Sequence, residues 1–362
     1  MYSTLRHLPA LFYKHRPVQL TFFVTRRCNA KCPFCFYLQC EGELPEQQGE
    51  LQLDEIDALA PTIGPLLWLA FSGGEPYLRR DLDQIARTFY RHTRPSIILI
   101  STNALTPRRI QEQTEAILRD CPRSVVVVKL SLDGVGDDHD QLRATPGSFD
   151  KTLATYQALA PLLNRYANFE LGINTVFCAD NQDKMDQIID FVQTLSGIRT
   201  HTISMVRGNL QNKGLQCIDL VKYQRAVERL EGGARSGGMP RYQFRGARLK
   251  AAQDILQRRY IAETLTRHQR LIPCYAGRAN LVLTETGEVY PCEMLDESFG
   301  NVRRHDYDMR RILRSDAAQA VRRDIDTQRC YCTHECHLMT NILLNPRLYP
   351  ALAREYLGLA AS

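Results

Sequence analysis

Residues 19–35 read QLTFFVTRRCNAKCPFC, an apolar run followed at once by three closely spaced cysteines. The first part, Gln19–Thr25, predicts a β-strand because β-branched and aromatic side chains favour extended backbone. Cys28, Cys32 and Cys35 follow in a CxxxCxxC pattern. Three thiolates on one tight loop can bind three corners of a [4Fe–4S] cluster, which leaves one iron open to a small molecule.

Zinc is the alternative occupant of this loop. Structural zinc normally takes four protein ligands, and catalytic zinc takes three ligands and a water. Cys40 stands near enough in the sequence to complete a zinc site. The context of the loop, described below, favours the cluster. For Cys121, Cys178 and Cys217, which are scattered in the sequence, we expect the role of small buried hydrophobic residues.

The composition is that of a globular protein. The chain has 362 residues, of which 44% are hydrophobic and 24% charged, a size that suggests about two domains. It has neither an apolar stretch of membrane-spanning length nor a secretory signal at its start, so we expect a cytoplasmic protein. In a reducing compartment, twelve cysteines that cluster point to metal binding or catalysis rather than to disulfides.

The positive charge is concentrated at one end. The net charge is +6, and residues 1–40 hold six Lys or Arg and no Asp or Glu. A nucleic-acid-binding protein would carry a broader basic face, so no nucleic-acid partner is expected. We interpret the segment as a solvated basic helix that leads to the edge of an anionic-ligand site.

Strand and helix patterns alternate through the first 207 residues. Five further strands are predicted at Leu67–Ser72, Ser96–Thr102, Val125–Asp133, Phe169–Phe177 and Thr200–Val206. Helices are predicted at Asp54–Ile63, Asp81–His92, Pro107–Arg119, Ser148–Leu163 and Asn181–Leu195, with Asp54 and Ser148 as N-caps. Six such βα units favour an α/β fold, either a partial (β/α) barrel or a doubly wound sheet.

Polar and glycine residues gather where the predicted strands end. They are Gly73, Gly74, Glu75 and Pro76 after the second strand, Thr102 and Asn103 on the third, Ser131 and Asp133 on the fourth, and Asn174 in the fifth. Sites in such folds lie beyond the carboxyl ends of the strands. We therefore expect these residues to share one site with the cysteine loop.

The rest of the chain has a different pattern. Residues 208–272 predict a helical bridge with a break at Gly232-Gly233 and Gly237-Gly238. Residues 273–345 predict a small cysteine-rich α+β domain, with a hairpin of Leu281–Thr284 and Val289–Pro291 and a helix at Asp308–Asp324. Together with a basic N-terminal helix at 1–17, the barrel at 18–207 and a helical tail at 346–362, this gives five segments.

The cysteine loop resembles the signature of the radical S-adenosylmethionine (SAM) superfamily, and the resemblance spans residues 18–207. It implies a partial (β/α)6 barrel of the TIM type, in which Cys28, Cys32 and Cys35 hold a catalytic [4Fe–4S] cluster. Gly73-Gly74-Glu75-Pro76 looks like the family's GGEP motif, whose backbone and glutamate meet the methionine amino group.

The resemblance implies further cofactor contacts. Phe34 matches the aromatic residue beside the adenine, and Thr102-Asn103 resembles a Thr-Asn-Gly motif in which Ala104 replaces the glycine. Ser131, Asp133 and Asn174 match polar positions that face ribose or methionine, and Arg143 resembles an arginine that pairs with the carboxylate.

The C-terminal cysteines are similar to the Twitch/SPASM extension, which holds auxiliary iron–sulfur clusters. Cys274 and Cys292 flank a hairpin, and Cys330, Cys332 and Cys336 follow. Five thiols can fully ligate one cluster, so we expect one auxiliary [4Fe–4S] cluster held by Cys274, Cys292, Cys336 and either Cys330 or Cys332. Four thiolates also suit a zinc ribbon, which is the alternative.

The resemblance implies reductive cleavage of SAM to a 5′-deoxyadenosyl radical that abstracts hydrogen from a substrate, with electrons from a flavodoxin or ferredoxin. Only 27 residues precede Cys28, too few for a peptide-recognition domain, so a small-molecule or lipid-like substrate is favoured. The alternatives are a ribosomal-peptide maturase and a non-catalytic iron–sulfur scaffold. We expect a monomer.

The N-terminal segment has an apolar face. Leu5, Leu8, Leu11 and Phe12 recur at helical spacing among basic residues, although Pro9 interrupts the pattern. We expect a short helix that packs this face on the open side or the floor of the barrel. The alternative is weak contact with an anionic membrane surface.

Overall fold

The computed structural model describes residues 2–14, 16–38, 49–237, 242–327 and 330–359. Within them one sheet of nine strands runs in the order β6-β5-β4-β3-β2-β1-β7-β8-β9. The strands are β1 (Gln19–Thr25), β2 (Trp68–Gly73), β3 (Ile97–Thr102), β4 (Val125–Ser131), β5 (Phe169–Phe177), β6 (Thr200–Met205), β7 (Asn280–Leu283), β8 (Glu288–Tyr290) and β9 (Gly300–Asn301). The hypothetical fourth zinc ligand, Cys40, lies outside the described residues.

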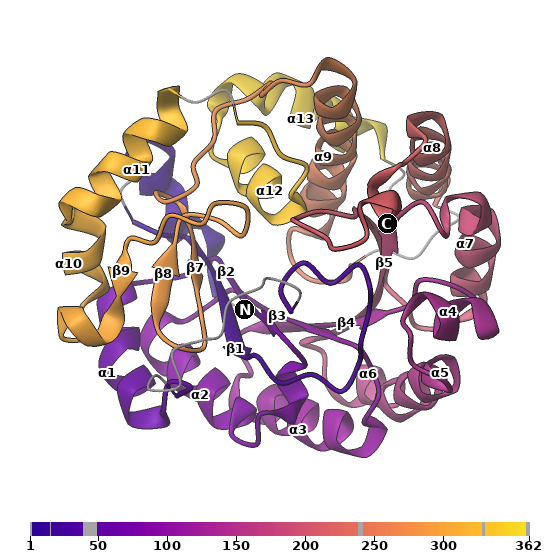
Figure 1. Ribbon diagram of the computed structural model, residues 1–362, viewed down its shortest axis with the longest axis horizontal. Coiled ribbons are helices and arrows are strands. Elements are labelled where there is room, and N and C mark those ends of the chain that lie inside the picture. The colour runs from indigo at the N-terminus through magenta and orange to yellow at the C-terminus, as the bar shows by residue number, and fades with distance from the viewer. Residues whose placement is uncertain (1, 15, 39–48, 238–241, 328–329, 360–362) are drawn as a thin grey trace.

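Strands β1 to β6 pair in parallel in chain order, which confirms the partial barrel and excludes the doubly wound alternative. Helices α1 (Leu53–Ile63), α2 (Leu82–Thr93), α3 (Pro107–Asp120), α4 (Asp137–Leu142), α5 (Ser148–Leu159), α6 (Leu162–Arg165) and α7 (Met185–Thr194) connect them. Figure 1 shows α1, α2 and α3 together on one side of the sheet.

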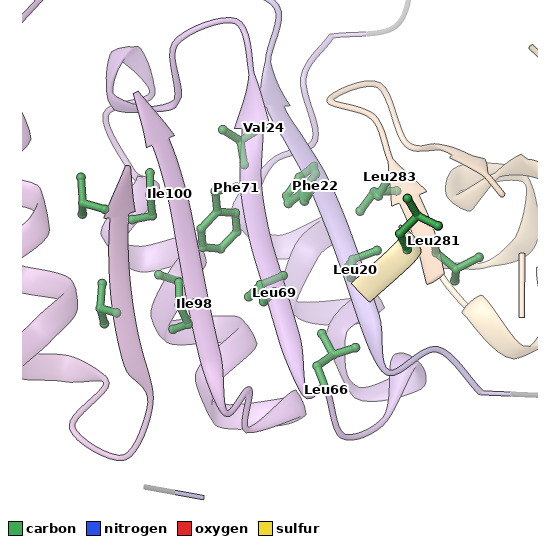
Figure 2. Packing of buried hydrophobic residues seen from close by; sticks show 14 of the residues in the cluster. Leu20, Phe22, Val24, Leu66, Leu69, Phe71, Ile98, Ile100, Leu281 and Leu283 are labelled. Atoms are coloured by element: carbon green, nitrogen blue, oxygen red, sulfur yellow. The ribbon is translucent and has the colours of Figure 1, made fainter. Parts of the chain in front are cut away.

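The main core fills the space between the sheet and these helices. Leu20 and Phe22 of β1 lie level with Leu69 and Phe71 of β2, and all four are fully buried. Figure 2 shows the same layer continuing through Ile98 and Ile100 on one side and through Leu281 and Leu283 on the other. Burial of such side chains is worth about 2 kcal/mol each relative to exposure, so this layer holds the strands in register.

The C-terminal hairpin extends the barrel sheet. β7 pairs in parallel with β1, from Gln19 opposite Asn280 to Phe22 opposite Leu283, and β8 then pairs antiparallel with β7. The sequence predicts the hairpin but gives no sign of this pairing. The cysteine-rich segment is therefore continuous with the barrel through one sheet.

The bridge consists of α8 (Leu220–Ser236) and α9 (Ala247–Arg267). The predicted break at Gly232-Gly233 is wrong, because α8 passes through both glycines and ends at Gly237 in the left-handed conformation. Buried contacts of Tyr223, Val227 and Leu230 outweigh a cost of about 1 kcal/mol for each glycine. Gly238 lies outside the described residues.

The C-terminal helices are α10 (Met309–Arg314), α11 (Asp316–Thr327), α12 (Glu335–Leu343) and α13 (Tyr349–Gly358). Helices α9, α12 and α13 pack on one another, and Figure 1 shows them on the side of the molecule opposite α1, α2 and α3. The single helix expected at Asp308–Asp324 is divided, because Ser315 has extended backbone between α10 and α11.

Two local expectations in the barrel are also corrected. The cap of α1 is Gln52, which forms a capping box with Glu55, so Asp54 lies inside the first turn. Gly147 in the left-handed conformation precedes α5, and Ser148 is therefore its first helical residue. The expected helix Ser148–Leu163 ends at Leu159, and α6 follows separately.

The N-terminal segment forms a 3-10 helix, η1 (Thr4–Leu11), and its predicted orientation is wrong. Leu5 is 67% and Phe12 81% exposed, whereas His7 and Ala10 are buried. Residues three apart lie on one face of a 3-10 helix, so Leu5 and Leu8 share a face that points outward, while His7 and Ala10 share the buried one. The segment does lie at the barrel floor, because Arg6 donates to the Leu66 carbonyl at 2.9 Å.

No helix in the described part of the chain is long and apolar enough to cross a membrane.

One arginine joins the C-terminal segment to the barrel. Arg303 donates to both carboxylate oxygens of Glu55, at 2.6 and 2.9 Å, and to the carbonyls of Thr286 and Gly49. The guanidinium hydrogen bonds lower the pKa of Glu55 to about 2, against the opposing effect of burial. This contact ties α1 to the loop after β9.

We predict that Arg303→Ala lowers the apparent melting temperature by about 2–5 °C, because four charge-assisted or carbonyl hydrogen bonds are lost. The matched control is Arg310→Ala, which removes an exposed arginine paired only with Asp308. We expect the control to shift the transition by less than about 1 °C. Equal shifts in thermal denaturation would contradict this role of Arg303.

Candidate functional site

The loop after β1 carries Cys28, Cys32 and Cys35 to the carboxyl edge of the sheet. The three thiols line a cavity of about 230 Å³, which we call the cysteine-loop cavity. Seven of the residues expected at a cofactor also line it: Phe34, Gly74, Thr102, Asn103, Ser131, Arg143 and Asn174. The structure thus brings together side chains from five successive strands and their loops, as the sequence predicts.

Hydrogen-bond donors point at the sulfur atoms. The Ala30 amide lies 3.4 Å and the Asn103 side-chain amide 3.5 Å from Cys28 Sγ. Arg143 Nη1 lies 3.7 Å from Cys32 Sγ. Burial raises the pKa of the Cys28 thiol, and that of Cys32 to about 11. These thiols therefore need a bound cation to become thiolates, and the donors then stabilise the anionic sulfur.

The donor set fits an iron–sulfur cluster. The thiols lie close together: Cys35 raises the pKa of Cys28, and both of them raise that of Cys32. No three His, Cys, Asp or Glu side chains in the described ranges converge on a point where a single metal ion would sit. Three cysteine thiols on one loop are the ligand type of an iron–sulfur cluster, so the donor set fits a cluster.

The loop after β2 packs directly on the cysteine loop. The Gly74 amide donates to the Thr25 carbonyl and the Glu75 amide to the Arg27 carbonyl, both at 2.8 Å. A β-carbon on Gly74 would lie 2.8 Å from the Arg26 carbonyl oxygen and closer still to that of Arg27. Only glycine allows this approach of two backbones.

Glu75 does not line the cavity. It is 1% exposed and accepts hydrogen bonds from the Tyr77 amide, the Thr102 hydroxyl and the Asn103 amide, at 3.2, 2.8 and 2.7 Å. Burial outweighs these bonds and raises its pKa to about 7. In this structure Glu75 joins the loops after β2 and β3; Gly73 and Pro76 likewise lie beside the cavity rather than on its wall.

Asp133 is fully buried behind the cavity wall. It accepts from Arg143 Nε at 2.7 Å and from the Val176 amide at 2.7 Å. Burial alone would lower the pKa of Arg143, but Asp133 and Cys32 outweigh it and raise the pKa. Asp133 therefore holds Arg143 against the cysteine loop instead of facing the cavity.

A second cavity, of about 150 Å³, opens inside the barrel, and we call it the inner cavity. It shares Ser101, Asn174, Ser204 and Arg207 with the cysteine-loop cavity. Lys129 and Trp68 also line it, as do Tyr242 and Lys250 from the bridge. The sequence analysis did not identify Lys129, Trp68, Tyr242 or Lys250. A lysine in the otherwise apolar strand β4 could have indicated a polar cavity at Lys129.

The C-terminal cysteines divide between two cavities. Cys274, Cys292, Cys330 and Cys332 line a separate C-terminal cavity of about 210 Å³. Cys336, the first-turn residue of α12, lines the inner cavity instead. The expectation that Cys336 is one of the four cluster ligands stays a prediction. The inner cavity therefore lies between the cysteine loop and the C-terminal cysteines.

A buried ionic network connects β6 to the C-terminal segment. Arg207 pairs with Glu293 and with Glu335, each at 3.1 Å, and His334 pairs with Glu293 at 2.6 Å. Burial would raise the pKa of Glu293, but His334 and Arg207 together lower it well below its usual range. Glu293 follows Cys292 and Glu335 precedes Cys336, so the network positions both cysteines.

Family models match two parts of the chain. Residues 22–192 match the radical SAM superfamily, and residues 274–337 match SPASM, an iron–sulfur cluster-binding domain. The two matches cover the cysteine loop with its barrel and the five C-terminal cysteines.

Curated relatives share about a quarter of their residues with this chain. The AdoMet-dependent heme synthase of Oleidesulfovibrio alaskensis is 25% identical over 295 residues, which cover 77% of this chain and 70% of the relative. The PqqA peptide cyclase of Rhizobium meliloti is 23% identical over 307 residues, which cover 83% and 74%. The relatives thus differ widely in what they act on.

Solved structures share the fold. Streptococcus suis SuiB bound to S-adenosylmethionine superposes with a TM-score of 0.61 at 15% identity, covering 88% of this chain and 71% of that one. Native anSMEcpe with bound AdoMet gives a TM-score of 0.60 at 15% identity, covering 94% and 99%. The cysteine loop, the barrel and both family matches agree, and the chain belongs to the radical SAM superfamily, with a catalytic [4Fe–4S] cluster, SAM and a SPASM domain for an auxiliary iron–sulfur cluster.

Proposed function

We propose that this enzyme generates a 5′-deoxyadenosyl radical in the cysteine-loop cavity and uses it to abstract hydrogen from a substrate in the neighbouring inner cavity. The observation that carries the proposal is the convergence of Cys28, Cys32 and Cys35 with Asn103 and Arg143 on one cavity. When bound, the [4Fe–4S] cluster and SAM supply one-electron cleavage of the sulfonium C–S bond.

Each wall residue has a part in this chemistry. The three cysteines hold the cluster, and the open backbone of Gly74 admits the methionine end of SAM. Arg143, fixed by Asp133 at 2.7 Å, supplies a cation for the methionine carboxylate. Asn174 and Ser131 present polar groups to the ribose, and Phe34 packs against the adenine. Glu75 acts as a positioning residue because its oxygens are taken by neighbouring loops.

The auxiliary cluster is assigned to Cys274, Cys292, Cys330 and Cys332. These four thiols surround one cavity, and burial raises the pKa of Cys274, that of Cys292 to about 12 and that of Cys332 to about 11. Four thiolates leave no iron open, which suits electron transfer rather than substrate ligation.

The substrate of this enzyme is a small molecule or one end of a larger one, because the inner cavity holds only about 150 Å³. A peptide substrate is the second candidate, favoured by the similarity to the PqqA peptide cyclase. Electrons come from a flavodoxin or a ferredoxin. A cytoplasmic location is proposed, because clustered cysteines suit metal binding in a reducing compartment.

We predict that the anaerobically reconstituted protein binds about eight irons and, with a reductant, converts SAM to 5′-deoxyadenosine. The triple variant Cys28→Ala, Cys32→Ala, Cys35→Ala should lose about half of the iron and all SAM cleavage. Chromatography of the products and iron analysis measure both. Zinc in stoichiometric amount with one cluster, or 5′-deoxyadenosine from the triple variant, would contradict the assignment.

Replacement of Gly74 tests the contact between the two loops. Gly74→Ala should weaken SAM binding at least about ten-fold, because its β-carbon pushes the loop after β2 away from the cysteine loop. The control Gly232→Ala adds the same methyl group where no atom lies within 4 Å. Calorimetric titration with SAM should show wild-type binding for the control, and equal affinity for both variants would reject the contact.

The auxiliary ligands can be tested in the triple variant, which retains only the auxiliary cluster. Adding Cys330→Ser should reduce the iron from about four to less than one per chain, and adding Cys336→Ser should leave about four. Iron analysis and electron paramagnetic resonance after reduction measure the outcome. Loss of iron with Cys336→Ser and retention with Cys330→Ser would show that Cys336 is the fourth ligand.

A further inference from the structure

The inner cavity contains one cation without a carboxylate partner. Arg207 is neutralised by Glu293 and Glu335, and the Lys250 ammonium pairs with Asp254. Lys129, from the middle of β4, has no carboxylate of the described residues within 4.0 Å. Its ammonium donates to the hydroxyl groups of Thr200 at 2.8 Å and Thr202 at 2.6 Å, and it lies over the Tyr242 ring, 5.9 Å from the centroid.

This arrangement is costly in the absence of a ligand. Lys129 is 6% exposed, and an unpaired charge is expensive to bury. An ammonium has three donors, of which the threonines take two. Burial, assisted by the nearby charge of Lys250 and opposed by the more distant Asp254 carboxylate, lowers the pKa of Lys129 to about 7. An anion in the cavity would restore the charged form and use the remaining donor.

Other groups on the wall also lack an acceptor. The indole N–H of Trp68 and the Nε–H of Arg207 are buried without a hydrogen-bond partner. Among the residues described, none that lines this cavity has a buried acceptor atom without a donor. The buried polar atoms of this wall that lack a partner are therefore donors, and they suit a ligand with acceptor oxygens.

Part of the wall is apolar. Leu99, Tyr242 and Met339 line the cavity beside Trp68. Such a wall suits a short hydrocarbon or aromatic body attached to the acceptor group. One unpaired ammonium balances the single charge of a carboxylate, whereas a phosphate dianion would remain half neutralised.

We propose that the inner cavity binds the substrate and that this substrate carries a carboxylate on an apolar body, with the carboxylate paired to Lys129. The inference rests on the proposed function, because the cavity shares Ser101, Asn174 and Ser204 with the cysteine-loop cavity. The body of the substrate then lies between the site of radical formation and Cys336.

The chain carries its own reporter for this site. Trp68 is the single tryptophan of the sequence and lines the inner cavity. Its fluorescence in the reconstituted holoenzyme therefore reports occupancy without any need for turnover. The probes are hexanoate and hexanamide, which share length and shape and differ in charge, with hexyl phosphate as a third arm.

We expect hexanoate to change the fluorescence saturably and to bind at least about ten-fold more tightly than hexanamide or hexyl phosphate. In Lys129→Met the preference for hexanoate over hexanamide should fall to less than about three-fold. The matched control is Lys151→Met, an exposed position of α5, which should keep the wild-type preference. Melting temperatures show whether each variant is folded.

Three results would overturn the inference: no saturable hexanoate binding to the wild type, equal affinity for hexanoate and hexanamide, or tighter binding of hexyl phosphate. The comparison of probes on the wild-type protein decides this even if Lys129→Met fails to fold. A separate SAM-cleavage assay on the wild type distinguishes the two proposals. Absence of 5′-deoxyadenosine rejects the proposed function, whereas the fluorescence result judges the carboxylate site alone.

Discussion

The parallel pairing of β1 with β2 on one side and β7 on the other is the constraint on which the rest of the structure depends. β1 delivers the cysteine loop at its carboxyl end, and β7 begins the hairpin that leads to Cys292. Because both strands belong to one hydrogen-bonded sheet with a shared apolar layer, the two groups of cysteines are held at a fixed separation (Figure 2). Electron transfer between two clusters needs such a fixed separation.

The barrel was readable from the sequence because its signals are local. β1 and β5 begin and end where the hydrophobic pattern predicts, and the remaining barrel strands agree within two residues at either end. The cysteine loop could also be predicted from its pattern. The same holds for Gly74, because a close approach of two backbones allows few residues other than glycine. Predictions failed where packing, rather than local sequence, decides the secondary structure. Helix α8 continues through Gly232, for example, because its buried residues stabilise the helix.

The site could be predicted only in part, because contacts between residues distant in the sequence decide where several of its side chains lie. Spacing places Glu75 and Asp133 near the cofactor, but hydrogen bonds from other loops turn both carboxylates away from the cavity. The assignment of Cys336 depends on where α12 begins relative to β6, which no local pattern encodes. Lys129 follows a run of four valines. It becomes informative only when the structure shows that its ammonium meets threonine hydroxyls and no carboxylate of the described residues within 4.0 Å.

Ion pairs account for most of the charged side chains around the inner cavity. Glu293 stands next to Cys292, and its negative charge would oppose the thiolates of the auxiliary cluster if Arg207 and His334 did not neutralise it. Arg207 also pairs with Glu335, which stands next to Cys336. Arg207 is consumed in that task, although it lines both cavities. Lys250 is likewise matched by Asp254 within α9. Arg207 and His334 thus offset Glu293 and Glu335, and Lys250 offsets Asp254. Among the described residues that line the cavity, this leaves Lys129 as the cation without a carboxylate partner.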